Sequence, residues 1–161
     1  MAHRLAANER WLCASHSYVQ RRGIPLSPKE LESHSYICIR ENNDDVTLWH
    51  FRSRDKSASA ASSPRQSMRM DPALVTNDGE VARQWAELGL GIVLRSQWDV
   101  EAAVTAGRLV RVLSDWEMGR ADILALTPSR NGISRNVEQF VSCLREQSVD
   151  APSYGLAAGN R

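Results

Sequence analysis

The chain has 161 residues, of which 42% are hydrophobic and 24% are charged, so it can bury a core and fits one domain or slightly more. Its 20 basic and 19 acidic residues leave a formal net charge of +1, which argues against a nucleic-acid-binding surface, because such surfaces carry a basic excess. The three cysteines are far apart, which excludes a dense disulfide framework and a zinc site.

The first quarter of the chain predicts strands alternating with short helices. Residues 10–14 (RWLCA) form a short apolar strand, and Ser15 is a candidate N-cap for a helix that Gly23 ends. A capping box of Ser27 and Glu30 with Pro28 between them predicts a short helix over 28–33. Residues 36–40 (YICIR) read as a buried strand.

A hairpin-like pair of strands is expected next. Residues 46–51 (VTLWHF) and 66–71 (QSMRMD) both alternate in the manner of strands. The Ser-, Ala- and Arg-rich stretch over 53–67 between them predicts a mobile loop.

The second half continues the alternation. Thr76 or Asn77 can cap a helix whose first turn carries Asp78 and Glu80, and that helix ends at Gly89. The elements expected after it are strand 92–94, a helix from Ser96 to Gly107, strands 109–113 and 121–126, and an amphipathic helix over 134–147. The tail over 149–161 is expected to be frayed. The order of elements indicates an α/β domain with crossover connections.

The sequence gives little support for catalysis. It contains no HExxH, GxSxG, P-loop or GxGxxG motif, and its four histidines lack metal-binding spacing. We therefore expect no catalytic residue, no metal and no cofactor. Three helix starts, at Ser15, at Thr76 or Asn77, and at Ser96, each follow an extended segment, and free amides at such starts favour an anion. For each start taken alone, simple capping is the more common explanation, and only the three together favour a cleft for a small anion.

Several ordered segments resemble one known family. They are Trp11–Val19 with Arg22–Pro25, the stretch from Asn77-Asp78-Gly79 to Gly89–Leu94, the Gly107–Val110 stretch, and the final Phe140–Glu146 helix. In this order they are similar to the effector-binding domain of LysR-type transcriptional regulators. The resemblance implies a type 2 periplasmic-binding-protein-like fold, whose lobe has a mixed central sheet flanked by helices, and in which a small effector sits between two lobes.

The resemblance also implies how the chain is divided. Residues 1–127 match a nearly complete second lobe, 128–148 a C-terminal helix that normally packs on the first lobe, and 149–161 a flexible tail. The family's DNA-reading helix-turn-helix has no counterpart in these residues, so DNA is expected as a partner only through a segment absent from this chain. The apolar stripe on the last helix would lose its usual sheet. We therefore expect it to dock on a partner chain, in a homo-oligomer formed there or at an exposed sheet edge, or on the second lobe itself.

Carrying the family's effector contacts onto this chain gives six expected site residues: Ser15, Thr76, Asn77, Asp78, Arg95 and Ser96. Arg95 stands where many relatives have proline, and its guanidinium could pair with a carboxylate effector or face solvent. The expected function is the sensing of a small, anionic effector to control transcription. The alternative is a stand-alone small-molecule-binding module without a DNA partner. With no apolar leader segment and no apolar run of about 18 residues, the expected location is the cytoplasm, without membrane contact.

Overall fold

A computed structural model describes residues 2–40, 47–54, 65–127 and 134–149. Within them, the elements in chain order are β1 (Ala2–Ala6), β2 (Arg10–Ala14), α1 (His16–Arg22), a 3-10 helix (Pro28–Ser33), β3 (Tyr36–Ile39), β4 (Leu48–Ser53), β5 (Arg65–Arg69), β6 (Leu74–Thr76), α2 (Gly79–Glu87), β7 (Ile92–Ser96), α3 (Gln97–Thr105), β8 (Val110–Val112), β9 (Trp116–Glu117), β10 (Ile123–Leu126) and α4 (Arg135–Val149). The expected α/β architecture is confirmed.

The central feature is a five-stranded sheet in the order β6-β3-β7-β2-β8. Strand β3 is parallel to β6 and β7, whereas β2 is antiparallel to β7 and β8. The sheet is therefore mixed, as the sequence predicts, and β2 is the strand that runs against its neighbours. The expected hairpin is also confirmed, because β4 pairs antiparallel with β5 and, at its other edge, with β9.

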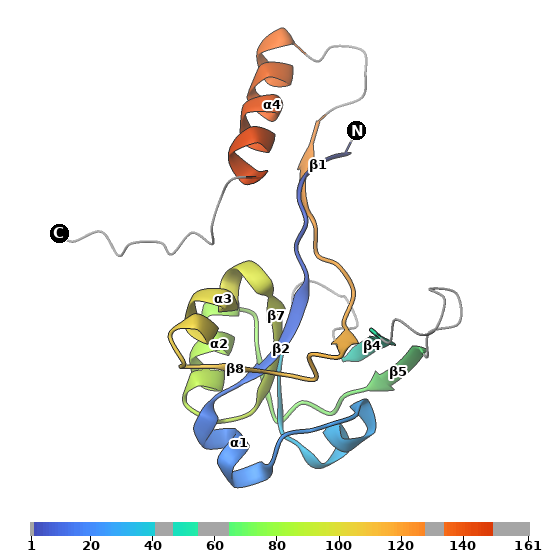
Figure 1. Ribbon diagram of the computed structural model, residues 1–161, viewed down its shortest axis with the longest axis vertical. Coiled ribbons are helices and arrows are strands. Elements are labelled where there is room, and N and C mark those ends of the chain that lie inside the picture. The colour runs from blue at the N-terminus through green and yellow to red at the C-terminus, as the bar shows by residue number, and fades with distance from the viewer. Residues whose placement is uncertain (1, 41–46, 55–64, 128–133, 150–161) are drawn as a thin grey trace, which may run out of the picture.

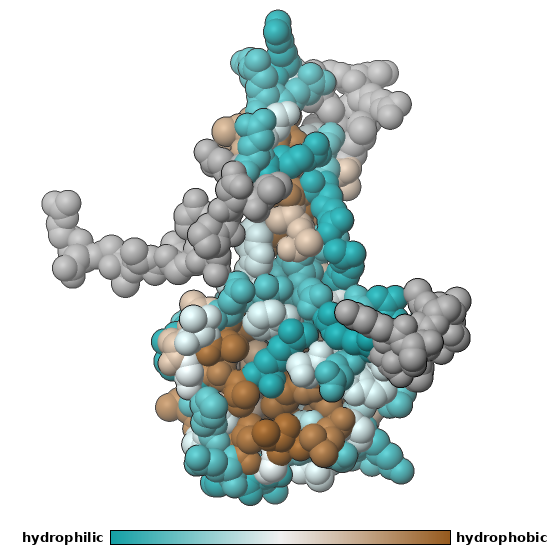
Figure 2. Space-filling model, viewed as in Figure 1, coloured by the Kyte–Doolittle hydropathy of each residue, from teal (hydrophilic) through white to brown (hydrophobic). Residues whose placement is uncertain are grey.

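Both faces of the five-stranded sheet are covered. One face presents Cys13, Ile37 and Val93 to alanines and valines of α2 and α3, and all of these side chains are buried. The opposite face packs Leu12 and Ile92 into a cluster that also holds Leu31 and the hairpin's Phe51. We call this part of the molecule, residues 10–117, the sheet body. Figure 2 shows the hydrophobic side chains gathered mostly in this lower part, with hydrophilic residues along the junction above it.

A second, smaller unit stands beyond the sheet body and consists of β1, β10 and α4; we call it the helix body (Figure 1). Strands β1 and β10 form a two-stranded antiparallel sheet, with Ala2 opposite Leu126. Helix α4 packs against β1 and buries Val141, while Phe140 stays 62% exposed. Helix α4 thus packs on β1, a strand within residues 1–127 that was not predicted from the sequence, and the docking of its exposed part on a partner chain stays a prediction.

Parts of two predictions lie outside the described residues. The centre of the expected mobile loop and the expected frayed tail cannot be compared with the structure. The ends of that loop differ from the prediction, because β4 extends to Ser53 and β5 begins at Arg65. The pairing of Arg52 with Arg65 across the hairpin accounts for the difference, since ladder hydrogen bonds hold polar residues in a strand as well as apolar ones.

Candidate functional site

One edge of the five-stranded sheet gathers the ends of several elements. Strands β3, β6 and β7 are parallel, so their carboxyl ends meet there, and the antiparallel β2 begins at the same edge. Helices α2 and α3 also begin there, directly after β6 and β7. Ligands of open α/β sheets bind at such an edge, where free backbone amides of helix N-termini favour anions. We call it the ligand edge.

The strand register aligns four residues across the ligand edge. Arg10 pairs with Ser96 between β2 and β7. Continuing the β3 register by one residue brings Arg40 beside Asn77, and the Arg40 amide donates to the Thr76 carbonyl at 2.7 Å. Neighbouring strands lie about 4.8 Å apart, so the backbones of Arg10 and Arg40, two strands apart, are separated by about 10 Å. The ligand edge therefore carries a row of two cations and two small polar side chains, formed by Arg10, Ser96, Arg40 and Asn77.

The start of α2 is built by Asp78. Its Oδ1 accepts hydrogen bonds from the amides of Glu80 at 2.8 Å and Val81 at 3.2 Å, so Asp78 is the N-cap. The prediction that Thr76 or Asn77 caps this helix is wrong by one or two residues. The Thr76 hydroxyl instead accepts from the Asp78 amide at 3.1 Å and so orders the turn that leads into the cap. Asn77 is exposed between them.

The Arg95 side chain lies across the start of α2. Its guanidinium forms an ion pair with Asp99 in the first turn of α3, and the arginine side chain is 20% exposed. The same group covers Gly79, the first residue of α2, so closely that a Cβ there would lie 2.6 Å from Cζ. Arg95 is thus paired with Asp99 and lies against the start of α2, and its contact with a carboxylate effector stays a prediction.

Ser96 is the N-cap residue of α3, yet its hydroxyl makes no capping hydrogen bond. The hydroxyl oxygen accepts from Nδ2 of Asn8 at 2.7 Å. Oδ1 of the same asparagine accepts from the Trp98 amide at 3.4 Å. A residue from outside the sheet body therefore caps α3, and a remote residue of this kind cannot be found from the sequence around Ser96.

Ser15 does not belong to the ligand edge. It follows the carboxyl end of β2, and β2 runs opposite to β7, so Ser15 lies at the far end of the sheet. Five residues separate it from Arg10, which is about 17 Å along a strand. Its buried hydroxyl accepts from the Tyr18 amide at 3.2 Å and bonds to the Ser17 hydroxyl at 3.0 Å. The structure gives Ser15 a capping role and separates it from the other five expected residues.

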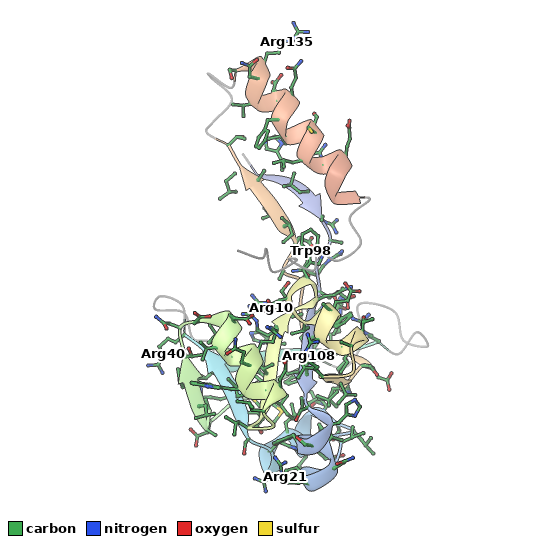
Figure 3. The ribbon with its side chains drawn as sticks, turned by 90° about the vertical axis from the view of Figure 1, so that its left-hand side faces the viewer. Arg10, Arg21, Arg40, Trp98, Arg108 and Arg135 are labelled. Atoms are coloured by element: carbon green, nitrogen blue, oxygen red, sulfur yellow. The ribbon has the colours of Figure 1, made fainter. Side chains whose placement is uncertain are left out.

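Two cations at the ligand edge were not predicted from the sequence. Arg10 and Arg40 are both exposed, and no side-chain partner is recorded for either within the described residues. Figure 3 shows them on separate strands of the sheet body, with Trp98 close to the junction with the helix body. Each is an arginine at one end of an apolar strand, a placement that does not by itself single out a binding residue. Two exposed guanidiniums at one edge suit a ligand with negative charge.

Glu9 forms a charged cluster beside the edge. Its carboxylate accepts from the Trp11 indole at 3.3 Å and from Arg54 at 2.6 Å, and Arg111 lies 3.7 Å away. Burial raises the pKa of Glu9, but the hydrogen bonds from Arg54 and Trp11 outweigh it, so the pKa lies below its ordinary value. Glu9 therefore offsets part of the positive charge of Arg54 and Arg111 beside the ligand edge.

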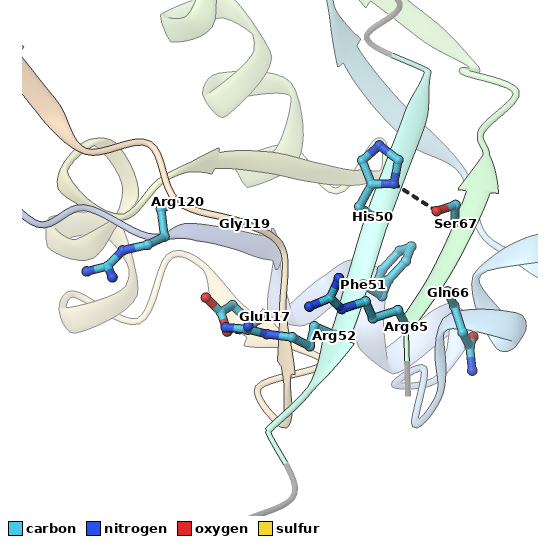
Figure 4. Close-up of a pocket in the computed structure, with 9 residues that line it drawn as sticks. All are labelled: His50, Phe51, Arg52, Arg65, Gln66, Ser67, Glu117, Gly119 and Arg120. Atoms are coloured by element: carbon cyan, nitrogen blue, oxygen red, sulfur yellow. Dashed lines mark hydrogen bonds and ion pairs between the residues drawn. The ribbon is translucent and has the colours of Figure 1, made fainter. Parts of the chain in front are cut away.

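A separate cavity of about 440 Å³ lies on the outer face of the three-stranded sheet (Figure 4). Arg52, Arg65 and Arg120 line it. Arg52 is paired with Glu117, and Arg120 lies 3.4 Å from Asp122, so most of the positive charge is compensated. The hydrogen bond of 2.8 Å between His50 Nδ1 and the Ser67 hydroxyl closes one side. Its charge balance makes it a weaker anion site than the ligand edge.

The described residues show no arrangement for metal binding and no activated thiol. No three His, Cys, Asp or Glu side chains gather within the described ranges as metal ligands would. Cys13 and Cys38 are buried, and burial raises the pKa of Cys13 to about 12. No helix among the described residues is long and apolar enough to span a membrane.

Comparison with known proteins adds sequence relatives. A family model described as LysR substrate binding domain matches residues 1–149. The chain is 34% identical over 160 residues to the HTH-type transcriptional activator TtdR of Escherichia coli O6:K15:H31, a match that covers 96% of this chain and 48% of that protein. It is 31% identical to the HTH-type transcriptional regulator DmlR of Escherichia coli K12, covering 97% and 48%. The chain thus spans about half the length of these curated relatives.

Solved structures share the fold. The full-length Vibrio cholerae virulence activator AphB aligns with a TM-score of 0.73 and 20% identity, covering 92% of this chain and 48% of that one. The regulator CrgA of Neisseria meningitidis aligns with a TM-score of 0.71 and 21% identity, covering 92% and 47%. The regulatory domain of AphB from Vibrio vulnificus aligns at 0.69, covering 89% and 67%.

Proposed function

The chain belongs to the LysR substrate binding domain family, and from this premise we propose that it senses a small anionic effector at the ligand edge. The effector would be held by Arg10 and Arg40, with the hydroxyl of Ser96 between them at the same level of the sheet. In a longer regulator, effector binding would alter contacts with DNA by shifting a population between two arrangements of the protein.

The observation that carries the proposal is the alignment of Arg10, Ser96 and Arg40 on three neighbouring strands. Two exposed arginines without a partner among the described residues lie at the same level of the sheet, on either side of Ser96. A guanidinium on each side can hold a carboxylate or phosphate through charge-assisted hydrogen bonds. Among the described residues of the edge, Arg95 is paired with Asp99 and Asp78 is engaged by amides of α2.

The test is binding of simple anions to the chain and its arginine variants. Sodium benzoate, succinate and phosphate are titrated at constant ionic strength while thermal unfolding is followed, because a ligand that binds the native state raises Tm. We expect at least one anion to raise Tm in the wild type. Arg10→Ala and Arg40→Ala should each weaken that anion's affinity about tenfold, the value of one charged hydrogen bond.

The matched control is Arg22→Ala. Arg22 is an exposed arginine at the end of α1, at the opposite edge of the sheet, so its removal changes the net charge equally without touching the ligand edge. An equal loss of affinity in this variant would show a general charge effect and contradict the proposed site. So would full affinity in both edge variants.

The location and the assembly of the protein are parts of the same proposal. We propose a cytoplasmic regulator, in keeping with relatives that are named as transcription regulators. A homo-oligomer would use α4, where Phe140 is 62% exposed, or the edge strand β6, where Val75 is 41% exposed. Gel filtration of Phe140→Glu and Val75→Lys would distinguish the two surfaces by which variant dissociates.

A further inference from the structure

Asn8 joins three segments that are far apart in the sequence. Its Nδ2 donates to the Ser96 hydroxyl at 2.7 Å and to the Ala121 carbonyl at 3.0 Å. Its Oδ1 accepts from the Trp98 amide at 3.4 Å. Its own amide donates to Asp122 at 3.2 Å, and its carbonyl accepts from the Ala121 amide at 2.8 Å.

These bonds leave Asn8 with a single orientation. The amide nitrogen must face the Ala121 carbonyl, which can only accept, and the amide oxygen must face the Trp98 amide, which can only donate. The residue is 3% exposed, so exchanging any of these bonds for one to water requires the site to open. A buried, fully bonded asparagine of this kind specifies one arrangement of the chain around it.

Asn8 lies where the chain crosses between the helix body and the sheet body. The chain passes between the helix body and the sheet body twice, at residues 7–9 and at residues 118–122 (Figure 1). Asn8 bonds the first crossing to the second through Ala121 and Asp122, and bonds both to the start of α3 through Ser96 and Trp98. A further backbone bond, from the Gln97 amide to the Glu9 carbonyl at 2.8 Å, reinforces the same junction.

We propose that Asn8 is a positioning residue that fixes how the helix body stands on the sheet body, and that its bond to Ser96 links this placement to the ligand edge. The Ser96 hydroxyl accepts from Asn8, and within the described residues no acceptor is recorded for its own proton. A ligand that accepts this proton strengthens the bond to Asn8, because hydrogen bonds in a chain polarise one another. This second part rests on the proposed function; the positioning role does not.

The test measures the placement directly. Spin labels are attached to the natural Cys143, which is exposed on α4, and to Ala102→Cys, which is exposed on α3. Cys13 and Cys38 are buried and stay unlabelled in the folded chain. Pulsed electron resonance then gives the distribution of distances between the two bodies. We expect Asn8→Ala to broaden or shift this distribution, and Ser96→Ala to act in the same direction with a smaller effect.

A destabilised control separates positioning from simple loss of stability. Val100→Ala creates a cavity at a fully buried position of α3 without touching the junction, and we expect it to lower Tm while leaving the distance distribution unchanged. Equal broadening by Val100→Ala, or a wild-type distribution in Asn8→Ala, would overturn the positioning role. A wild-type distribution in Ser96→Ala would overturn the link to the ligand edge. All arms are run without ligand, so failure of anion binding in the earlier titration does not affect them.

Discussion

Replacing Gly79 by alanine should reveal the contact between Arg95 and the start of α2. An added Cβ would lie 2.6 Å from Cζ and Nη1 of Arg95, so the guanidinium must move and its pair with Asp99 must weaken. Loss of that pair costs about 1 kcal/mol, because both side chains are less than one-third exposed. The alanine itself stabilises a helix by up to about 1 kcal/mol relative to glycine. In the wild-type background the two effects nearly cancel.

The decisive comparison repeats the substitution in an Arg95→Ala background. The overlap and the ion pair are both absent there, so Gly79→Ala should stabilise the chain by up to about 1 kcal/mol, or about 2–4 °C in Tm for a domain of this size. Urea unfolding of the four proteins gives the coupling free energy as a double-mutant cycle. Equal shifts for Gly79→Ala in the two backgrounds would refute the contact.

Three further outcomes are expected. Leu12→Ala, at a side chain 1% exposed in the sheet, should lower the free energy of unfolding by about 2–5 kcal/mol in urea titrations, whereas Leu26→Ala, at one 78% exposed, should change it by less than about 0.5 kcal/mol. The depressed pKa of Glu9 means that its stabilisation is present above the unfolded pKa of about 4.5 and lost as pH falls through the lower folded value; Glu9→Gln should flatten this part of the pH profile of Tm, and an unchanged profile would exclude the Arg54 pair as its cause. Alkylation followed by mass spectrometry should modify exposed Cys143 at once and Cys13, whose pKa is about 12, only after unfolding; rapid labelling of Cys13 would contradict its burial.

Local signals predicted most of the sheet body. The apolar run of Tyr36–Ile39 and the polar start of α2 are visible in a few neighbouring residues, and both elements form, although the cap of α2 is Asp78 and not Thr76 or Asn77. Strands β1, β6 and β9 were missed because they are short and their partners are distant. β1, for example, has one large apolar residue and pairs with β10 some 120 residues later. Pairing between strands so far apart in the sequence produces no local hydrophobic periodicity from which either strand could be predicted.

The candidate site was predicted in part for a related reason. A helix start can be recognised locally, but the direction of the preceding strand cannot, so Ser15 was grouped with residues that the antiparallel β2 places at the opposite edge. Arg10 and Arg40 were missed because arginines at strand ends are common, and only the register shows that these two share a level. Asn8 carried no signal, since its partners come from two remote segments.

The bridge between Glu9 and Arg120 means that the polypeptide enters and leaves the sheet body at a single point. A stretch of chain whose two ends touch can be cut out and spliced into a surface loop of an unrelated host without stretching either partner, because termini in contact match the spacing that a loop already provides. The 110 residues between Glu9 and Arg120 therefore form a segment whose two ends are close enough for insertion into a loop of another protein.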